Sequence, residues 1–289
     1  MFTASVNSYA KINTGLRVIR KRDDGFHDLE TIFYPVKLRD QISIEIQRSE
    51  NDHNSVIIKS DKPFIPLSKD NLCYKAVEQF FREFRVKENY NIILSIKKNI
   101  PVGGGLGGGS SNAAAVIRFL INFMNIDIAS NREKILNIAL SIGSDVPFFL
   151  MLKPCYAGSR GERMVFLKEY RINYDILIVN PNLHISTRWA FEKLNYRKGF
   201  SKPYVLKDIT KFEPGIFKLL ENDFEEVVFR KYSELKDIKS ELIDLGAEFS
   251  SMSGTGATMY GMFDKNNKAS LKKCRDYYDE KKYFTFISE

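Results

Sequence analysis

Residues 101–115 read P-V-G-G-G-L-G-G-G-S-S-N-A-A-A and hold six of the chain's 17 glycines. Glycine adopts positive φ readily and has no side chain, so several neighbouring N–H groups of such a run can point toward one anion. We expect no regular helix within the glycines, because each one costs backbone entropy. Ser110 and Ser111 are favourable N-cap residues for a helix over residues 113–123. A glycine-rich loop that ends at a helix N-terminus is typical of a phosphate-binding site.

Other glycine-rich loops share parts of this pattern. The dinucleotide-binding pattern G-x-G-x-x-G fits Gly103, Gly105 and Gly108, but the predicted helix leaves no room for a second strand before the acidic Asp127. A Walker loop requires a lysine where Gly109 stands. A flexible linker stays open as an alternative, although capping serines and an alanine-rich helix seldom follow a linker directly.

The composition is that of a globular protein. The chain has 289 residues, enough for one large domain or two ordinary ones. The formal net charge of +8 suits a protein that handles polyanions such as nucleotides, and equally a simple abundance of lysine, since basic and acidic residues are intermixed. No interleaving of aromatic and basic residues indicates nucleic-acid binding.

The cysteines and the apolar segments indicate a compartment. Cys73, Cys155 and Cys274 lie far apart and form no C-x-x-C pair, which argues against a disulfide framework or a zinc site. No stretch reaches the ~18 apolar residues of a membrane span, and the N-terminus lacks a secretory signal. We therefore expect a cytoplasmic protein without a membrane partner.

The first fifth of the chain is expected to form strands around a tight turn. Period-2 geometry places Lys11 and Asn13 on one strand face, where they can be solvent-exposed or can be donors aimed at an anion. Asp24 and Gly25 form a strong turn signal. The predicted strands cover residues 2–6, 9–20, 29–38 and 41–46.

Phe26 and His27 directly follow the turn. An aromatic ring next to an imidazole can stack on a flat base and hydrogen-bond its edge. The alternative is a Phe26 that belongs to the core and a His27 that merely lies on the surface, and both interpretations stay open at this point.

Helix and strand signals continue along the chain. D-N-L at residues 70–72 predicts a capped helix that runs to residue 84. In G-S-D-V-P-F-F at residues 143–149, Val146 precedes a proline, which predicts a turn at Asp145 and then an apolar strand. S-M-S-G-T-G at residues 251–256 is either an ordinary β-turn or a loop that packs beside the phosphate-binding loop. Other predicted elements are strands at 55–59 and 90–98, a helix at 131–142, a hairpin at 155–166, and β-α-α-β-β-α-β after residue 167.

Three motifs occur in a fixed order: A-K-I-N at residues 10–13, the glycine loop, and S-G-T-G-A at residues 253–257. In this combination the chain resembles the GHMP small-molecule kinases, from Lys11 to about Phe263. D-D-G-F-H-D-L and G-S-D-V-P-F-F resemble most closely the branch of that family whose substrate is a cytidine diphosphate derivative of methylerythritol. The resemblance implies an α+β fold with an S5-like N-terminal domain, residues 1–166, that holds the ATP loop. A ferredoxin-like C-terminal domain, residues 167–289, would complete the substrate cleft.

The resemblance also implies an activity and residue roles. The activity is ATP-dependent phosphorylation of the substrate's 2-hydroxyl, in the non-mevalonate isoprenoid precursor pathway, with ATP and Mg²⁺ as cofactors. Asp145 would be the general base and Lys11 its electrostatic partner, and Ser110 or Ser111 is a candidate Mg²⁺ ligand. The implied substrate-binding residues are Asn13, Phe26, His27 and Phe191. The implied ATP-binding residues are Asn71, Lys98, Pro101, Val102, Gly103, Gly104, Gly105, Leu106, Gly107, Gly108, Gly109, Ser110 and Ser111.

Two other functions stay open within this resemblance. A GHMP kinase that acts on mevalonate or homoserine would have no use for an aromatic–histidine pair at Phe26 and His27. A non-enzymatic nucleotide-binding regulator would need the glycine loop but neither Lys11 nor Asp145. At position 26 the family usually has tyrosine, and phenylalanine keeps the stacking face without the hydroxyl.

Overall fold

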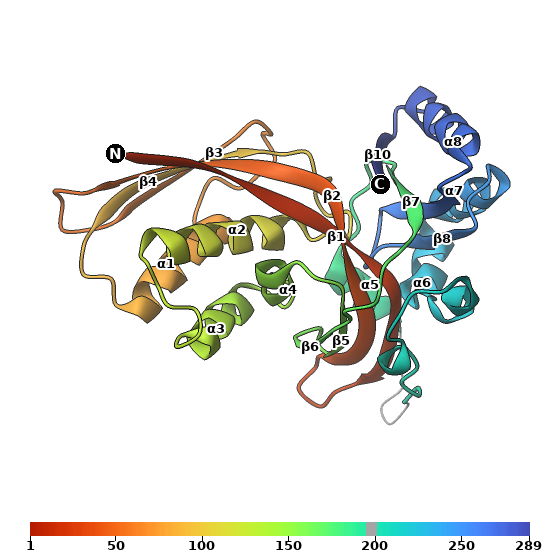
Figure 1. Ribbon diagram of the computed structural model, residues 1–289, viewed down its shortest axis with the longest axis horizontal. Helices are drawn as coiled ribbons and strands as arrows, with labels where there is room; N and C mark the ends of the chain where they lie inside the picture. The colour runs from red at the N-terminus through yellow and green to blue at the C-terminus, as the bar shows by residue number, and fades with distance from the viewer. Residues whose placement is uncertain (195–200) are drawn as a thin grey trace. The chain divides into compact units, whose positions relative to one another are not determined.

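The computed structural model describes residues 1–194 and 201–289 of the chain (Figure 1). Its contacts divide the chain into two compact units, each discontinuous in sequence. The first unit comprises Met1–Ala10, Leu38–Ile100 and Gly107–Leu152. The second unit comprises Lys11–Lys37, Pro101–Leu106 and Lys153–Glu289. The division into domains at residues 166 and 167 stays a prediction.

Two long strands, β1 (Phe2–Lys21) and β2 (His27–Arg48), contribute residues to both units. They pair with each other, and the predicted turn joins them, with Gly25 at φ 84°. The prediction of four separate strands in this region is wrong. Ser8 and Asp40 lie between the predicted strands, but both are buried in the continuous strands, and the first unit supplies their hydrogen-bond partners.

The first unit is a layer of helices against a sheet. The Gln41–Arg48 part of β2 pairs antiparallel with β4, and β3 pairs parallel with β4. Alternate β4 residues are buried, and α1 and α2 lie against one face of β3 and β4 (Figure 1). Its elements are β3 (Ser55–Ser60), α1 (Leu72–Phe84), β4 (Tyr90–Lys97), α2 (Gly108–Phe123), α3 (Arg132–Ile142) and α4 (Val146–Met151).

For two helices of the first unit, α1 and α4, the sequence-based predictions had different outcomes. The α1 prediction is confirmed, since the Asn71 side chain accepts a hydrogen bond from the Cys73 N–H at 2.9 Å. The predicted apolar strand after Asp145 is wrong, because these residues form α4 and bury Val146, Phe148 and Phe149. Pro147 is compatible with this helix because first-turn N–H groups have no intrahelical partner.

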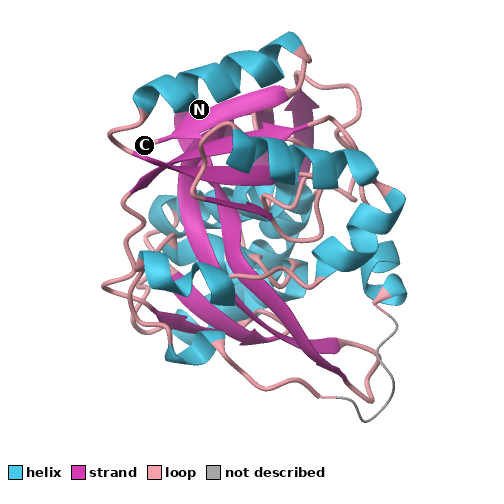
Figure 2. Cartoon of the chain, turned by 90° about the vertical axis from the view of Figure 1, so that its right-hand side faces the viewer, coloured by secondary structure: helices cyan, strands magenta, loops and turns pink. Residues whose placement is uncertain are grey.

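The second unit contains a strand layer and an α/β sandwich. Residues Leu29–Phe33 of β2 pair antiparallel with β5. Within the described residues, a four-stranded antiparallel sheet has the order β10-β7-β9-β8, as in a ferredoxin-like fold. The mixed helix and strand content is visible in Figure 2. The remaining elements are β5 (Cys155–Ser159), β6 (Arg163–Phe166), β7 (Tyr174–Asn180), α5 (Thr187–Lys193), η1 (Leu206–Asp208), η2 (Pro214–Leu219), α6 (Phe224–Lys231), α7 (Ser233–Asp244), β8 (Phe249–Met252), β9 (Met259–Asp264), α8 (Lys268–Glu280) and β10 (Phe284–Ser288).

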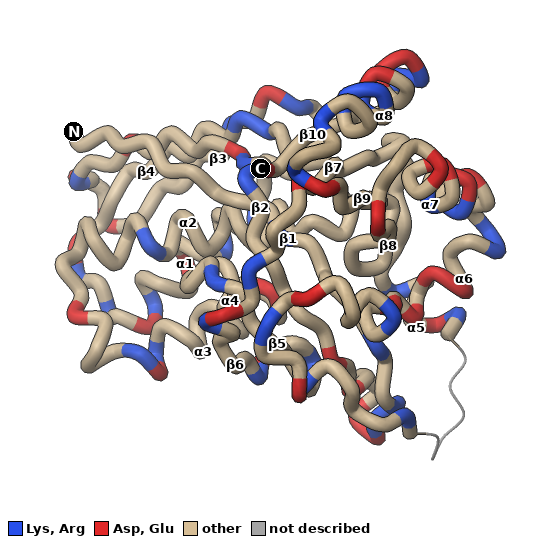
Figure 3. Tube along the Cα trace, turned by 45° about the vertical axis from the view of Figure 1, so that its right-hand side comes forward, with Lys and Arg blue, Asp and Glu red and all other residues tan. Residues whose placement is uncertain are grey.

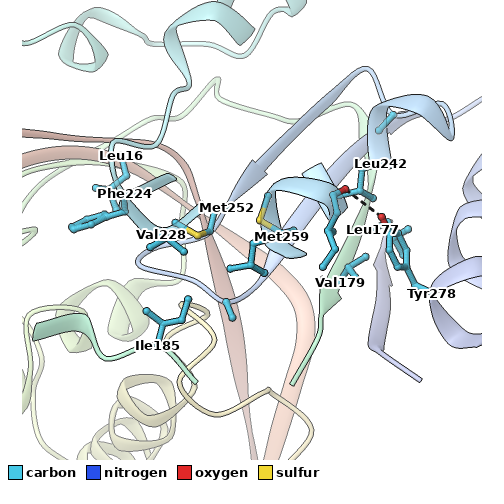
Figure 4. Packing of buried hydrophobic residues seen from close by; sticks show 14 of the residues in the cluster. Leu16, Leu177, Val179, Ile185, Phe224, Val228, Leu242, Met252, Met259 and Tyr278 are labelled. Carbon is cyan, nitrogen blue, oxygen red and sulfur yellow. Dashed lines mark hydrogen bonds between the residues drawn. The ribbon is translucent and has the colours of Figure 1, made fainter. Parts of the chain in front are cut away.

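The core of the second unit includes side chains from the N-terminal strand. Leu16 and Val18 of β1 are buried together with residues of the four-stranded sheet and its helices. Figure 4 shows Leu16 next to Phe224 of α6. Hydrogen bonds add to this packing, from Leu16 N–H to the Glu221 carbonyl at 2.8 Å and from Asp223 N–H to the Leu16 carbonyl at 2.9 Å.

Charge is distributed along the chain without a long block of one sign, as Figure 3 shows for Lys and Arg against Asp and Glu. Among the described residues, no helix has both the length and the apolar character needed to cross a membrane.

Candidate active site

The predicted phosphate-binding loop has alternate glycines in the left-handed region. Gly103, Gly105 and Gly107 have φ of 69°, 76° and 71°. Positive φ at such positions turns successive N–H groups toward one side, which is the geometry of an anion-binding nest. Residues 101–106 belong to the second unit and residues from 107 onward to the first.

In the first unit, α2 begins at Gly108, earlier than predicted, with Gly107 as the N-cap residue. Ser110 and Ser111 therefore lie in the first turn instead of at the N-cap, and the expectation that no glycine of the run would be helical is wrong. The Ser111 N–H donates to the Gly107 carbonyl at 2.9 Å, so the N–H groups just before it precede the helical hydrogen bonds and face outward at a positive helix end.

In the second unit, residues 101–106 pack against the S-G-T-G segment. The Ser253 hydroxyl donates to the Gly105 carbonyl at 3.0 Å, and the Thr258 N–H donates to the Gly104 carbonyl at 3.3 Å. A Cβ at Gly105 would lie only 2.0 Å from the Ser253 carbonyl oxygen. The interpretation that this segment packs beside the glycine loop is confirmed. The structure also places exposed His184 against the loop, since a Cβ on Gly103 would lie 2.2 Å from its Nδ1.

Lys11 of β1 is buried against the same loop. Its Nζ donates to the Gly105 carbonyl at 2.9 Å and to the Asn13 Oδ1, and its backbone N–H donates to the Leu106 carbonyl at 3.1 Å. The ammonium also lies 5.2 Å from the centroid of the Phe33 ring, within range of a cation–π interaction. The side chain is 3% exposed, so its charge acts with little screening by water.

Both the side chain and the backbone of Asn13 are hydrogen-bonded to groups of the second unit. Its Nδ2 donates to Thr31 Oγ1 at 2.8 Å, its backbone N–H donates to Ser253 Oγ at 3.2 Å, and its carbonyl accepts from the Tyr260 hydroxyl at 3.0 Å. Sequence reasoning missed Thr31 and Tyr260, because nothing in the local pattern distinguishes them from core strand residues. A direct substrate contact from Asn13 stays a prediction.

Asp145 is the N-cap residue of α4 in the first unit and is half-buried. The residues just before Asp145 lie next to the first turn of α2, since a Cβ on Gly143 would be 3.7 Å from Ser110 Oγ. This is an ordinary van der Waals contact, and Asp145 follows two residues after Gly143.

Lys98 and Asn71, both predicted to bind ATP, are occupied by protein groups in the first unit. The Lys98 ammonium is buried in an ion pair with Asp40, whose Oδ1 also accepts from the N–H groups of Asn99 at 2.7 Å and Ile100 at 2.8 Å. Asn71, besides capping α1, donates through Nδ2 to the Pro66 carbonyl at 2.7 Å. Nucleotide contacts from both residues stay predictions.

The predicted base site brings two of its three rings together. The centroids of His27 and Phe191 are 4.9 Å apart with an interplanar angle of 30°. Phe26 is 47% exposed, which rules out a core role, and the Arg160 guanidinium lies 3.7 Å from its centroid. Burial, and then the positive charge of Lys21, lower the pKa of His27 below its ordinary value of 6.5.

Comparison with known proteins gives two family matches and close relatives. The model of the GHMP kinases N terminal domain matches residues 71–153, and that of the GHMP kinases C terminal domain matches residues 196–279. The 4-diphosphocytidyl-2-C-methyl-D-erythritol kinase of Chlorobium phaeovibrioides is 36% identical over 92% of this chain and 89% of its own length. The enzyme of that name from Clostridium botulinum is 36% identical over 97% of this chain and 98% of its own length.

The chain belongs to the GHMP kinase family. A crystal structure of a 4-(cytidine 5'-diphospho)-2C-methyl-D-erythritol kinase matches it with a TM-score of 0.73 and 26% identity, over 99% of this chain and 98% of the other. The predicted α+β GHMP kinase architecture is confirmed. As a member of this family the chain is an ATP-dependent small-molecule kinase, not a non-enzymatic regulator.

ATP needs backbone N–H groups that can bind its phosphates. Residues 101–106 fit this need through the positive φ angles of Gly103 and Gly105, and residues from 107 onward fit it through the N-terminus of α2. For a metal, no group of three or more His, Cys, Asp and Glu side chains gathers within residues 1–194 and 201–289. The predicted Mg²⁺ would not require such a group, since Mg²⁺ bound with ATP is held mainly by phosphates and water with one or two protein ligands. Ser111 is fully buried and its hydroxyl donates to the Tyr9 carbonyl at 2.6 Å, so Ser110 is the better of the two predicted ligands.

Proposed function

We propose that this kinase transfers the γ-phosphoryl group of ATP to the 2-hydroxyl of 4-diphosphocytidyl-2-C-methyl-D-erythritol, a step of the non-mevalonate route to isoprenoid precursors. The observation that carries the proposal is the imidazole of His27 beside the ring of Phe191, because a kinase of non-nucleotide alcohols has no use for such a pair. Relatives with that name at 36% identity over nearly the whole chain support the choice of substrate.

The cytosine ring would be recognised by aromatic faces and by a neutral imidazole. With its pKa lowered, His27 is neutral at pH 7 and offers one ring nitrogen as donor and the other as acceptor. The edge of cytosine presents both kinds of group. The exposed ring of Phe26 supplies a flat apolar surface for stacking.

Lys11 would act through charge. Transfer of a phosphoryl group is accelerated mainly by positioning and by stabilisation of the charge that moves during the reaction. The Lys11 ammonium is buried, is held by the Gly105 carbonyl and the Asn13 amide, and so carries a fixed positive charge on the glycine loop. When bound with ATP, Mg²⁺ would neutralise phosphate charge, with Ser110 as the protein hydroxyl that would hold it.

Asp145 would accept the proton of the acceptor hydroxyl. A carboxylate placed as general base contributes about 10²–10⁴-fold in rate. Its position at the start of α4, close to the first turn of α2, supports this role. Lys11 belongs to one compact unit and Asp145 to the other, and each role is proposed from the surroundings of that residue within its own unit.

The test is a coupled ADP-release assay with the cytidyl substrate, mevalonate and homoserine as acceptors. We expect turnover with the cytidyl substrate and none with mevalonate or homoserine. Asp145→Asn should lower kcat by about 10²–10⁴-fold and change the KM for ATP less than about threefold. Asp237→Asn, at an exposed position on α7, is the matched control and should behave as the unmodified protein. Comparable rates with mevalonate would overturn the substrate assignment, and near-normal kcat in Asp145→Asn would remove the base.

A further inference from the structure

Thr31 of β2 is a buried hydroxyl between two groups of the second unit. Its Oγ1 lies 2.6 Å from the Gly15 carbonyl oxygen and 2.8 Å from the Asn13 Nδ2, and the residue is 1% exposed. A hydroxyl has one proton to donate, and a carbonyl oxygen can only accept. The Thr31 proton therefore goes to Gly15, and the Thr31 oxygen accepts from the Asn13 amide.

This direction of hydrogen bonding determines which way the Asn13 side chain faces. The two ends of an amide have nearly the same shape, but only the NH₂ end can donate to Thr31. The carbonyl end must then face the Lys11 ammonium, to which Asn13 Oδ1 is hydrogen-bonded. A reversed amide would set NH₂ donors against a buried cation, which is unfavourable for both groups.

The rest of Asn13 has no freedom to compensate. Its N–H is bound to Ser253 Oγ at 3.2 Å, and the Ser253 hydroxyl in turn donates to the Gly105 carbonyl at 3.0 Å. That carbonyl also accepts from the Lys11 ammonium, at 2.9 Å. These hydrogen bonds hold the backbone of the segment, so a rotation of the Asn13 amide would change the surroundings of the Lys11 ammonium.

We propose that Thr31 is a positioning residue, which holds the Asn13 amide in one orientation and thereby holds the Lys11 ammonium on the glycine loop. The inference rests on the role proposed above for Lys11 in phosphoryl transfer. The hydrogen bonds of the Thr31 hydroxyl go to Asn13 and Gly15. Its contribution should therefore appear in turnover and should depend on Asn13.

The experiment compares Thr31→Val, which removes the hydroxyl and keeps the shape, with Thr31→Ser, which keeps the hydroxyl. We expect Thr31→Val to lower kcat by about 10- to 100-fold, the effect of one buried polar group left without its partner. The KM for ATP should change less than about threefold, because the phosphate-binding amides are unaltered. Thr31→Ser should restore most of the turnover. Equal losses in both variants, or normal kcat in Thr31→Val, would overturn the proposal.

A double-mutant cycle with Asn13→Ala shows whether the effect passes through Asn13. We expect Thr31→Val to cause no further loss of kcat in the Asn13→Ala background, and additive losses would overturn the proposal. Circular dichroism confirms folding. If Thr31→Val does not fold, Thr31→Ala takes its place in the same comparison with Thr31→Ser. Lys11→Met separates the two levels of inference: full activity in that variant would refute the role of Lys11, whereas its inactivity together with normal turnover in Thr31→Val would refute the positioning role alone.

Discussion

Burial lowers the pKa of the His27 imidazole below 6.5, and the positive charge of Lys21 lowers it further. A basic group with a lowered pKa stays neutral in the folded protein until the pH falls to that lowered pKa, which lies below its unfolded value. At pH 7 the ring therefore has a donor and an acceptor for the edge of a base, and protonation at lower pH would convert the acceptor into a second donor.

At the residue scale, this predicts a specific pH dependence of substrate binding. The KM for the cytidyl substrate, measured at saturating ATP, should be flat from pH 7 to 8. It should rise as the pH falls through the lowered pKa of His27, below 6.5. His27→Gln, whose neutral amide keeps a donor and an acceptor, should remove the rise at low pH. A KM that increases on going from pH 7 to 8 would contradict the assignment, because it would mean that the protonated imidazole binds the base.

At the scale of elements, the glycines of the loop have different reasons to be glycine. Gly105 has positive φ, and its missing side chain leaves room for the Ser253 carbonyl oxygen. Gly109 lies exposed in the first turn of α2, and the nearest atom to a Cβ there is Leu72 Cδ1 at 3.5 Å. Gly105 must be glycine because of its left-handed backbone and its tertiary packing. Gly109 lies in ordinary helix and has no such requirement.

Alanine substitution should therefore have opposite effects at these two positions. Gly105→Ala should destabilise the protein by at least about 1 kcal/mol, the cost of left-handed backbone for a residue with a Cβ, with the clash in addition. It should also lower kcat/KM for ATP. Gly109→Ala should stabilise the fold by about 0.5–1 kcal/mol, because alanine is the better helix former. Urea unfolding monitored by circular dichroism measures both, and equal stability of the two variants would contradict this distinction.

At the scale of the whole chain, neither compact unit is a continuous segment. The second unit takes Lys11–Lys37 and Pro101–Leu106 from the N-terminal half. Leu16 and Val18, both from the first of these segments, complete its core. A segment that begins at residue 167, the predicted domain boundary, lacks them.

Residues 167–289 expressed alone should therefore be unstable. Loss of buried Leu16 and Val18 removes roughly 1.5–3 kcal/mol of stabilisation for each side chain, and the hydrogen bonds of β1 to Glu221 and Asp223 are lost as well. We expect no cooperative urea transition for this segment. A control that joins residues 11–37 to residues 153–289 should instead show a cooperative urea transition. A segment 167–289 as stable as the full chain would show that the predicted boundary delimits an independent domain.

Local signals predicted much of this structure. The sequence predicts three local features correctly: the Asn71 cap, the turn at Gly25 and the glycine loop. Each depends on the conformational preferences of a few neighbouring residues. The apolar run of α4 was misread as a strand, because six residues are too few for periodicity to distinguish the two. The prediction that β1 and β2 would each be interrupted is wrong for another reason. The residues that hydrogen-bond the side chains of Ser8 and Asp40 lie far away in sequence.

The order of the three motifs and the conformational freedom of the glycines are properties of the residues themselves, and they predicted a GHMP kinase with a phosphate-binding loop. What surrounds each of these residues follows from the tertiary structure. It set the Ser253 carbonyl against Gly105, buried Lys98 in an ion pair with Asp40, and turned the Asn13 amide toward Lys11 by means of Thr31. The physical reason is that hydrogen bonds and close packing join residues far apart in the chain, and a local pattern carries no information about such partners.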